Sequence, residues 1–457
     1  MDLELPVAAS WKSIKLISDA TFTTEATMNL STDIPSINAK TYANSITLSL
    51  YNVNTTEENK TITAYMMLLP VDFTGKTLKI KVSDYYNNNY IADAIIVNDN
   101  RNFEAQKARW ITANQFSLQE KPDYTWYDSS KSTYEIGKAN QLIALSNSAK
   151  GDATALSAIG VAEAPTFEGK TINLTNDIDL SFEIWTPIEQ FSGIFEGNNY
   201  TIKNLYCNQS GNLGLFKSTS NATIRNLIIS GLIQKDNKND TDKIGGFVAQ
   251  ASNSTFENCH SSVNIRTSGK PITMCVGGIC GRSDYSSFYA CSSNGIIEDQ
   301  QNIWEWTCYL GGIVGYSISN NIIACYKLRG NVFETNIQSY SYIGGIVGFI
   351  LAGDNSAIWG CYSAVDVKGR QPGLILGSIG TTKGSPNIKN SYYDGVGISN
   401  NTPIYGIGTK HYGGSEQSYD YGTARGLNIE GLNAGIAAWN TENPSNPCNY
   451  TYKQGSN

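Results

Sequence analysis

A short glycine-rich block recurs five times in the second half of this chain. Its copies read Ile-Gly-Gly-Phe-Val at 244–248, Val-Gly-Gly-Ile-Cys at 276–280, Leu-Gly-Gly-Ile-Val at 310–314, Ile-Gly-Gly-Ile-Val at 343–347 and Pro-Gly-Leu-Ile-Leu at 372–376. Two shorter copies precede them, Gly-Ile-Phe at 193–195 and Gly-Leu-Phe at 214–216. A repeat with such a period is one supersecondary unit, which buries its apolar face only against neighbouring units. The sequence therefore predicts a stacked architecture in which most repeated residues serve packing.

Aligning the copies gives three columns of residues. The first column holds Gly193, Gly214, Gly246, Gly278, Gly312, Gly345 and Gly373. The second holds Leu205, Leu227, Cys259, Cys291, Cys325, Cys361 and Ser391. The third holds Ile202, Ile224, Phe256, Phe288, Ile322, Ile358 and Ile388. Each unit contains short β-type segments separated by turn residues and lacks a sustained helical period, which predicts a β-solenoid with strands about 4.8 Å apart.

The repeat resembles the GLUG motif of large bacterial surface proteins. The resemblance rests on Gly-Gly-Ile-Val-Gly at 311–315 and 344–348, and on the asparagines before the second column, among them Asn204, Asn226 and Asn258. Upstream, the stretches 172–180, 185–188 and 191–197 are similar to the beginning of such arrays. The resemblance covers roughly residues 132–400. It implies a right-handed parallel β-helix on a secreted or cell-surface protein, and it implies no reaction.

Residues 1–120 follow a different pattern, because apolar and polar residues alternate in short runs such as 45–50 and 77–82. This alternation is typical of a β-sandwich. The strand order resembles a sandwich domain of fimbrillin-like surface proteins, including the segments 63–65, 70–76 and 103–107. We therefore expect an all-β chain: a fimbrillin-like β-sandwich at 1–120, a linker at 121–132, a β-helix with an N-terminal cap at 133–400, and a C-terminal cap and tail at 401–457.

Two short amphipathic segments are expected to be helical. Ala139, Leu142, Ile143 and Ser146 follow helical spacing, and a helix there would cover the open apolar end of the first coil. Leu432, Ile436 and Trp439 follow the same spacing at the other end of the array. These segments predict short helical caps.

Composition indicates an exported protein. Charged residues make up 16% of the chain and the net charge is −7, which disfavours a nucleic-acid or anionic-membrane partner. No apolar run approaches the roughly 20 residues that span a bilayer, and the start Met1-Asp2-Leu3-Glu4 lacks the features of a signal peptide. We expect an extracellular or outer-membrane surface protein, monomeric in solution, whose leader does not belong to this chain.

Cysteine and histidine usage argues against common catalytic and metal sites. Nine cysteines are an odd number, and four of them share one repeat column, which predicts a buried stack of reduced thiols. No Cys-x-x-Cys spacing accompanies them, so a metal site is not expected. The chain has two histidines; His260 aligns with Tyr326 and Tyr362 and is expected on the coil surface. A Ser-His-Asp arrangement is therefore not expected.

Acidic residues leave two alternatives open. Asp177 and Asp179 alternate on one strand and could ligate Ca²⁺ together with Asn176, although capping of the first turn through backbone hydrogen bonds is the favoured interpretation. We expect no cofactor. The acids within the coils fall at different phases of the repeat, so no tight pair of the kind used by polysaccharide lyases or hydrolases is implied.

Aromatic residues give the clearest functional signal. The segments joining one coil to the next glycine block vary most in length, and they contain Trp304, Trp306, Tyr309, Tyr340 and Tyr342. Exposed aromatic faces stack on sugar rings and anchor protein interfaces, whereas packing against the solenoid body is the alternative. We expect these residues to contact a protein or glycan of a host or bacterial surface. The sequence thus favours a non-catalytic adhesion or binding protein; the alternatives are a β-helical polysaccharide lyase or hydrolase and a structural stalk.

Overall fold

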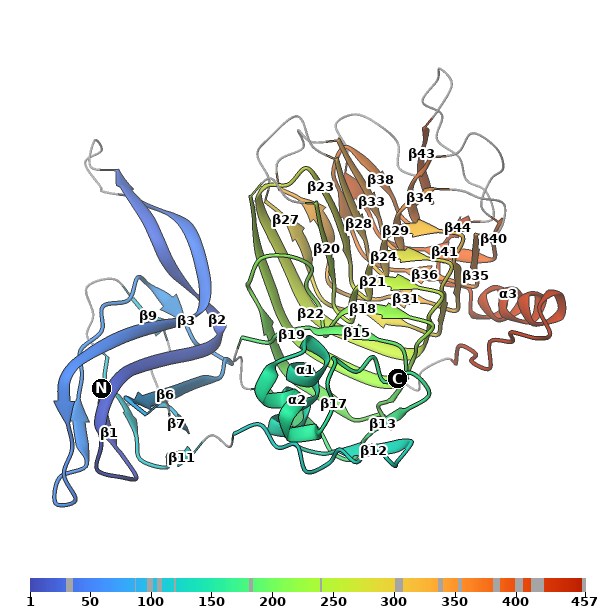
Figure 1. Cartoon of the computed structure of the whole chain (residues 1–457). Helices are drawn as coiled ribbons and strands as arrows, with labels where there is room; N and C mark the ends of the chain where they lie inside the picture. Colours follow the sequence, from blue (N-terminus) through green and yellow to red (C-terminus); the bar gives the residue numbers. More distant parts are fainter. Residues whose placement is uncertain are drawn as a thin grey trace. The chain divides into compact units, whose positions relative to one another are not determined.

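The computed structural model describes residues 1–29, 36–86, 88–96, 102–104, 109–118, 121–180, 184–238, 241–300, 307–335, 340–351, 356–380, 387–398, 406–411 and 423–453. The chain forms two compact units, Met1–Lys121 and Pro122–Asn457 (Figure 1). Each unit has its own hydrophobic core.

The first unit is built from β-sheets. One sheet has the order β4 (Thr61–Thr63), β1 (Asp2–Glu4), β10 (Ile111–Ala113), β8 (Ile95–Ile96). A second has the order β11 (Ser117–Leu118), β7 (Asn89–Asp93), β6 (Leu78–Asp84), β2 (Ser10–Asn29), β3 (Ser36–Asn54), and β5 (Val71–Asp72) pairs with β9 (Asn102–Phe103). Alternate residues of β6 are buried, as the sequence pattern predicts, because one face of the sheet covers the core around Trp11 and Phe73.

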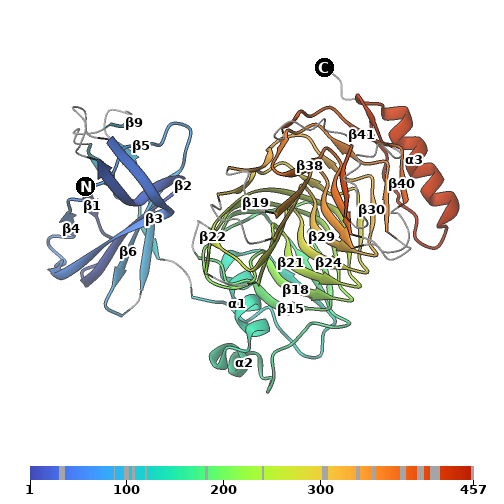
Figure 2. The same ribbon diagram turned by 90° about the horizontal axis from the view of Figure 1, so that it is seen from above.

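The second unit is a parallel β-solenoid with three stacked sheets, which we name S1, S2 and S3 (Figures 1 and 2). S2 comprises β15 (Ile188–Phe191), β18 (Phe216–Ser220), β21 (Val248–Ser252), β24 (Cys280–Asp284), β29 (Val314–Ile318), β34 (Val347–Leu351), β39 (Leu376–Gly380) and β43 (Ile407–His411). S3 comprises β20 (Thr241–Gly245), β23 (Thr273–Gly277), β28 (Thr307–Gly311), β33 (Tyr340–Gly344) and β38 (Gln371–Gly373).

S1 has twenty strands, because each coil contributes more than one short segment to it. They are β12 (Thr133–Ile136), β13 (Thr171–Leu174), β14 (Ile178–Asp179), β16 (Ile194–Glu196), β17 (Thr201–Cys207), β19 (Thr223–Lys238), β22 (Thr255–Lys270), β25 (Ser287–Tyr289), β26 (Ser292–Ser293), β27 (Ile297–Asp299), β30 (Asn321–Ile323), β31 (Tyr326–Lys327), β32 (Val332–Glu334), β35 (Ala357–Trp359), β36 (Tyr362–Ser363), β37 (Val367–Lys368), β40 (Asn387–Lys389), β41 (Ser391–Tyr393), β42 (Gly397–Ile398) and β44 (Thr423–Arg425). The predicted fold class is confirmed.

The strand register confirms most of the predicted columns. Leu227 pairs with Cys259, and the register continues from His260 through Ser292 and Tyr326, which stacks the four column cysteines in successive coils. The third column is likewise continuous from Ile224 to Ile388. His260 therefore lies at the surface position expected from its alignment with the tyrosines.

The predicted columns are wrong in the first coils. Ile202 pairs with Ile229, and Leu205 pairs with Gly231. In the third column, the register partner of Ile224 in the preceding coil is therefore Phe195 and not Ile202. Gly193 precedes a strand of S1 rather than of S2. The cause is that S3 begins only at β20, so the early coils are shorter and cannot be aligned on their glycines.

The last copy of the block is also shifted by one residue. Gly373 pairs with Gly344, so Leu374 rather than Gly373 follows Gly345 in the column. The other four copies of the five-residue block contain two consecutive glycines, whereas this copy contains one, which corresponds to the first of the two.

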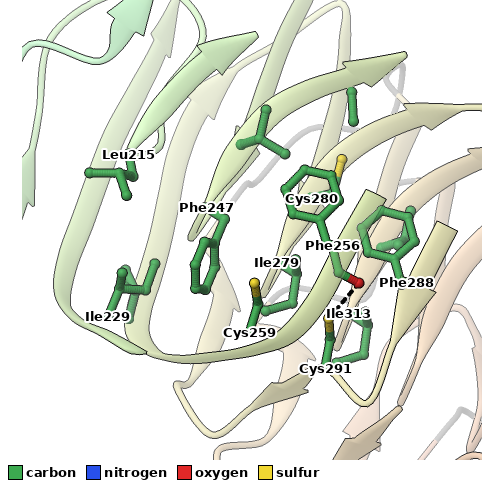
Figure 3. Close-up of a cluster of buried hydrophobic side chains, with 14 of the residues drawn as sticks. Leu215, Ile229, Phe247, Phe256, Cys259, Ile279, Cys280, Phe288, Cys291 and Ile313 are labelled. Carbon is green, nitrogen blue, oxygen red and sulfur yellow. Dashed lines mark hydrogen bonds between the residues drawn. The ribbon is translucent and has the colours of Figure 1, made fainter. Parts of the chain in front are cut away.

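Apolar side chains and thiols fill the solenoid (Figure 3). Phe256 and Phe288 stack with ring centroids 5.0 Å apart and planes 7° from parallel. The thiol of Cys291 donates to the carbonyl oxygen of Phe256 at 3.4 Å, and Cys259 makes the equivalent bond to Ile224 (Figure 3). All nine cysteines are buried and none is in a disulfide bond; burial raises the pKa of Cys259 and Cys325, which keeps these thiols protonated. The predicted stack of reduced thiols is confirmed.

The predicted helices are present, but they have different roles. Near the first coil lie α1 (Ala139–Lys150) and α2 (Ala153–Ile159); Leu142 and Leu145 of α1 enter the solenoid core and close its end. The helix α3 (Ile429–Glu442) instead lies against the flank of the coils (Figures 1 and 2). Its Trp439 ring packs edge-on against Trp359 at 5.5 Å. The expectation that this segment caps the end of the array is therefore wrong, because its apolar face covers outward-facing residues of S1.

Candidate functional site

Aromatic side chains gather on the outer side of the solenoid where S3 turns into S2. In each coil a strand of S3 ends in the glycine block, and the next strand of S2 begins immediately after it. Leu310 and Val314 point into the core, whereas Tyr309 and Tyr316 lie on the outer side of the same turn. The following coil repeats this arrangement with Tyr342 and Phe349, which are the register partners of Tyr309 and Tyr316.

These four residues, Tyr309, Tyr316, Tyr342 and Phe349, form a cluster that we name the corner aromatic cluster. Tyr309 stacks on Tyr342 with centroids 5.5 Å apart and planes 11° from parallel. Tyr316 stacks on Phe349 at 5.3 Å. Across the turn, the rings of Tyr309 and Tyr316 meet edge-on at 4.9 Å. The stacks follow from the solenoid itself, since identical positions of adjacent coils are one strand spacing apart.

The cluster has a covered half and an accessible half. Tyr342 and Phe349 are 5% and 6% exposed, whereas Tyr309 and Tyr316 are only partly buried. Burial raises the pKa of Tyr309 and Tyr316, so both hydroxyls stay protonated and can donate hydrogen bonds at any physiological pH. The partly buried rings thus present apolar ring edges together with hydroxyl groups.

A charged pair lies beside the accessible rings. Arg282 is the register partner of Tyr316 in the preceding coil, and its guanidinium carbon is 5.2 Å from the centre of the Tyr316 ring. Its Nε atom is 3.2 Å from Oδ1 of Asp284. A planar guanidinium next to an aromatic face adds hydrogen-bond donors without disturbing the stack.

The outer face continues as an apolar strip beyond the cluster. Ile318 and Leu351 occupy the ends of β29 and β34, and Leu351 is 42% exposed. Nearby, Tyr285 directly follows Asp284 and is 63% exposed. Contiguous exposed apolar side chains of this kind mark interaction surfaces.

The structure describes two of the five predicted contact residues fully. Tyr309 and Tyr342 lie together in the cluster, but in strands of S3 rather than in an exposed loop. Trp304 and Trp306 lie outside the described residues, and Tyr340 starts β33 without a described side chain. Tyr342 is 5% exposed, with its ring against Tyr309 and Phe349, and its role as a contact residue stays a prediction.

The prediction missed Tyr316, Phe349 and Arg282. A signal for two of them was present, since an aromatic residue directly follows Gly-Gly-Ile-Val-Gly in both complete copies of the motif. The alternation of a regular strand would have placed this residue on the core side. In the structure, Val314, Gly315 and Ser317 are buried, whereas Tyr316 is only partly buried.

The carboxylates considered for Ca²⁺ are engaged with the protein. Asp177 accepts from the Thr201 amide at 2.9 Å and forms an ion pair with Lys203 at 2.7 Å, and this lysine lowers the pKa of the Asp177 carboxyl. Asp179 accepts from the side-chain amide of Asn204 at 2.8 Å. Among the described residues no group of three or more His, Cys, Asp and Glu could hold a metal ion.

No family model and no curated protein matches this chain. Among solved structures, it is similar to a crystal structure of a Bacteroides ovatus protein described as "a putative immunoglobulin A1 protease". The TM-score is 0.37 and the identity 18%, over 69% of this chain and 89% of the other. This similarity is too low to transfer an activity. Within the described part of the chain, no helix is long and apolar enough to cross a membrane.

Proposed function

We propose that the protein is a binding protein of the cell surface, of the GLUG-motif type, which attaches to glycans through the corner aromatic cluster. The observation that carries the proposal is the pair of accessible rings, Tyr309 and Tyr316, on a rigid β-solenoid. Packed partners hold both rings from behind, so binding costs little side-chain entropy.

The chemistry of the cluster favours a sugar over a purely apolar partner. A pyranose ring has an apolar face of C–H groups and a rim of hydroxyls. Tyr309 and Tyr316, stacked on Tyr342 and Phe349, offer apolar ring edges and hydroxyl groups, and Arg282 and Asp284 supply a donor and an acceptor beside them. A flat protein interface would instead bury a larger apolar area with its charges at the rim.

The geometry also suggests the orientation of a bound chain. The aromatic and charged positions repeat along the solenoid axis because they are register partners in successive coils. A linear glycan that runs parallel to this axis would meet Arg282, then Tyr316, then Phe349, with the row of Asp284, Ile318 and Leu351 beside it. This arrangement supports recognition of an extended chain rather than of a single sugar.

A glycan array tests the proposal. The purified protein, a Tyr316→Ala variant and a control Tyr51→Ala variant are applied to the same array; Tyr51 is 83% exposed in the first unit. We expect the wild type and the control to bind the same subset of glycans and Tyr316→Ala to lose at least about tenfold in affinity, as for loss of one aromatic anchor. Binding that is equal for all three proteins, or absent for all, contradicts the proposal.

A further inference from the structure

A hydrogen-bonded serine–histidine pair lies on the outer side of S1, away from the corner aromatic cluster. His260 in β22 and Ser292 in β26 are register partners in neighbouring coils. The Nδ1 atom of His260 lies 2.8 Å from Oγ of Ser292, and its Nε2 atom lies 2.9 Å from Oδ1 of Asn258. Since a neutral imidazole has one donor and one acceptor nitrogen, these neighbours decide which nitrogen carries the proton.

The hydrogen bonds continue from Asn258 through Asn226 to the carboxylate of Glu196, and this carboxylate fixes the direction of every hydrogen bond in the chain. Glu196, paired with Arg225 at 2.6 Å, can only accept, so Asn226 must present its Nδ2 to it at 3.0 Å. The Oδ1 atom of Asn226 then accepts from Nδ2 of Asn258 at 2.9 Å. Asn258 is left with its oxygen facing His260, so Nε2 of the imidazole carries the proton.

It follows that Nδ1 of His260 has the free lone pair and accepts the hydroxyl proton of Ser292. Every donor in the chain from Ser292 through His260, Asn258 and Asn226 points toward Glu196. Positive charge that develops on the imidazole is stabilised along this chain, although more weakly than by a carboxylate bonded directly to the ring. Burial lowers the pKa of His260, which keeps the base in its neutral form at pH 7.

We propose that Ser292 is a nucleophile, with His260 as its general base, that reacts with carboxylic esters. In the step, Oγ of Ser292 attacks the carbonyl carbon and its proton passes to Nδ1 of His260. The bond to the alcohol breaks, and the alkoxide takes the proton from Nδ1 as it leaves. The result is an acyl-serine and a free alcohol, and water then hydrolyses the acyl-serine with the same base. This activity goes beyond the proposed binding function and does not depend on it.

The C-terminal segment at 443–453 packs on the coils beside this serine. In the next coil its register partner Tyr326 contacts the Tyr452 ring at 6.0 Å, and the Tyr452 hydroxyl donates to the carbonyl oxygen of Cys325 at 3.4 Å. The same segment packs Cys448 with Tyr289 and Ala324. Ser292 is 2% exposed and lies between His260 and Tyr326, whose ring centroids are 6.4 Å apart. The proposal therefore requires the C-terminal segment to move away before an ester can reach Ser292.

The backbone corner beside Ser292 is shaped for this covering segment. Residues at this corner have positive φ angles of about 50° in successive coils, at Asn226, Asn258, Ala290, Ala324 and Gly360. Asparagine favours this conformation, whereas alanine does not. Alanine and glycine take this position at Ala290, Ala324 and Gly360, beside α3 and the C-terminal segment, whereas the next coil keeps Asn390, which contacts α3 at Gly435.

Two asparagines of α3 hold the covering segment in place. Asn440 bonds both backbone groups of Cys448, at 2.7 and 3.0 Å, and Asn433 bonds both backbone groups of Tyr452, at 2.8 and 3.0 Å. Neither side chain contributes to the solenoid core. Replacing both by alanine releases the segment and leaves the hydrogen-bond chain intact.

The test uses a fluorophosphonate probe on the full chain. Attack by Oγ of Ser292 on phosphorus expels fluoride, and His260 takes the proton, so the probe reports the same nucleophile. The proteins are the wild type, the Asn433→Ala/Asn440→Ala double variant, the same variant with Ser292→Ala or His260→Gln, and Asn443→Ala as a matched control at the end of α3. Reaction of the Cys448 thiol, which is buried in the wild type, with a thiol reagent verifies release of the segment, and peptide mapping locates the label.

We expect the released variant to be labelled at Ser292 at least about tenfold faster than the wild type and the Asn443→Ala control. His260→Gln should lower the rate by about 10²-fold or more, as for loss of a general base, and the labelling rate should fall as the pH drops below the His260 pKa. Absence of label at Ser292 when the Cys448 thiol reacts freely overturns the proposal, as does a labelling rate that is unchanged in His260→Gln.

Discussion

Replacement of Lys327 by methionine should stabilise the protein at neutral pH. Lys327 lies in β31 with its side chain fully buried, and its Nζ atom donates to the carbonyl oxygen of Gly295 at 2.7 Å. Burial lowers its pKa from 10.5 to about 7. Since each pKa unit corresponds to about 1.36 kcal/mol, the buried amine costs the fold about 4 kcal/mol at pH 7. Methionine has a similar length and no charge, but it leaves the Gly295 carbonyl without this donor, which costs about 1–2 kcal/mol. We expect a net gain of about 2–3 kcal/mol.

The sign of the pH dependence follows from the same pKa. Between pH 7 and about 10 the unfolded chain holds the Lys327 proton, whereas the folded chain has largely released it. Because the unfolded state binds more protons, the contribution of Lys327 to the free energy of unfolding rises with pH. Its cost falls to about 1 kcal/mol at pH 10. The difference in unfolding free energy between Lys327→Met and the wild type should therefore shrink by about 3 kcal/mol across this range. Urea unfolding at pH 7, 8.5 and 10 measures the difference. A constant difference, or a less stable variant at pH 7, refutes the reasoning.

Three further predictions concern the packing of the coils. Gly312→Val should destabilise the fold by about 3 kcal/mol, because a Cβ there would lie 1.9 Å from the Gly345 carbonyl oxygen. An unchanged urea midpoint would show that the coils containing Gly312 and Gly345 can move apart to make room for the side chain. A thiol reagent should find no reactive cysteine in the native protein and nine in the denatured protein, because all nine thiols are buried and none is in a disulfide bond. A disulfide-linked peptide containing Cys259 and Cys291 would contradict this. Ala324→Asn should cost about 1–3 kcal/mol although asparagine suits its φ of 56°, because the side chain would displace the C-terminal segment; a gain in stability would place that segment elsewhere.

The repeat architecture could be predicted because each coil repeats the same contacts. The second and third columns hold from Ile224 and Leu227 onward, where an apolar or thiol side chain must lie above its equivalent in the preceding coil. The alignment failed at Leu205 because the early coils lack a strand in S3, and a single sequence does not show where that strand begins. Helices were predictable from spacing, but not which surface α3 would cover.

The candidate site was predictable only in part, for a local structural reason. Tyr309 stood out in the sequence as an aromatic residue near two tryptophans. Tyr316 did not, because its outward direction depends on an irregularity between Val314 and Ser317 that the alternating pattern does not contain. The pair formed by His260 and Ser292 lies 32 residues apart in sequence and meets only through the register of neighbouring coils.

Isothermal titration tests the central claim, glycan binding by the corner aromatic cluster, most directly. The strongest ligand from the array is titrated into the wild type, Tyr316→Ala, Tyr309→Ala and the Tyr51→Ala control under identical conditions. The account predicts that each cluster variant loses about 1–3 kcal/mol of binding free energy with an unchanged unfolding midpoint, and that the control binds as the wild type does. Wild-type affinity in both cluster variants would contradict the account.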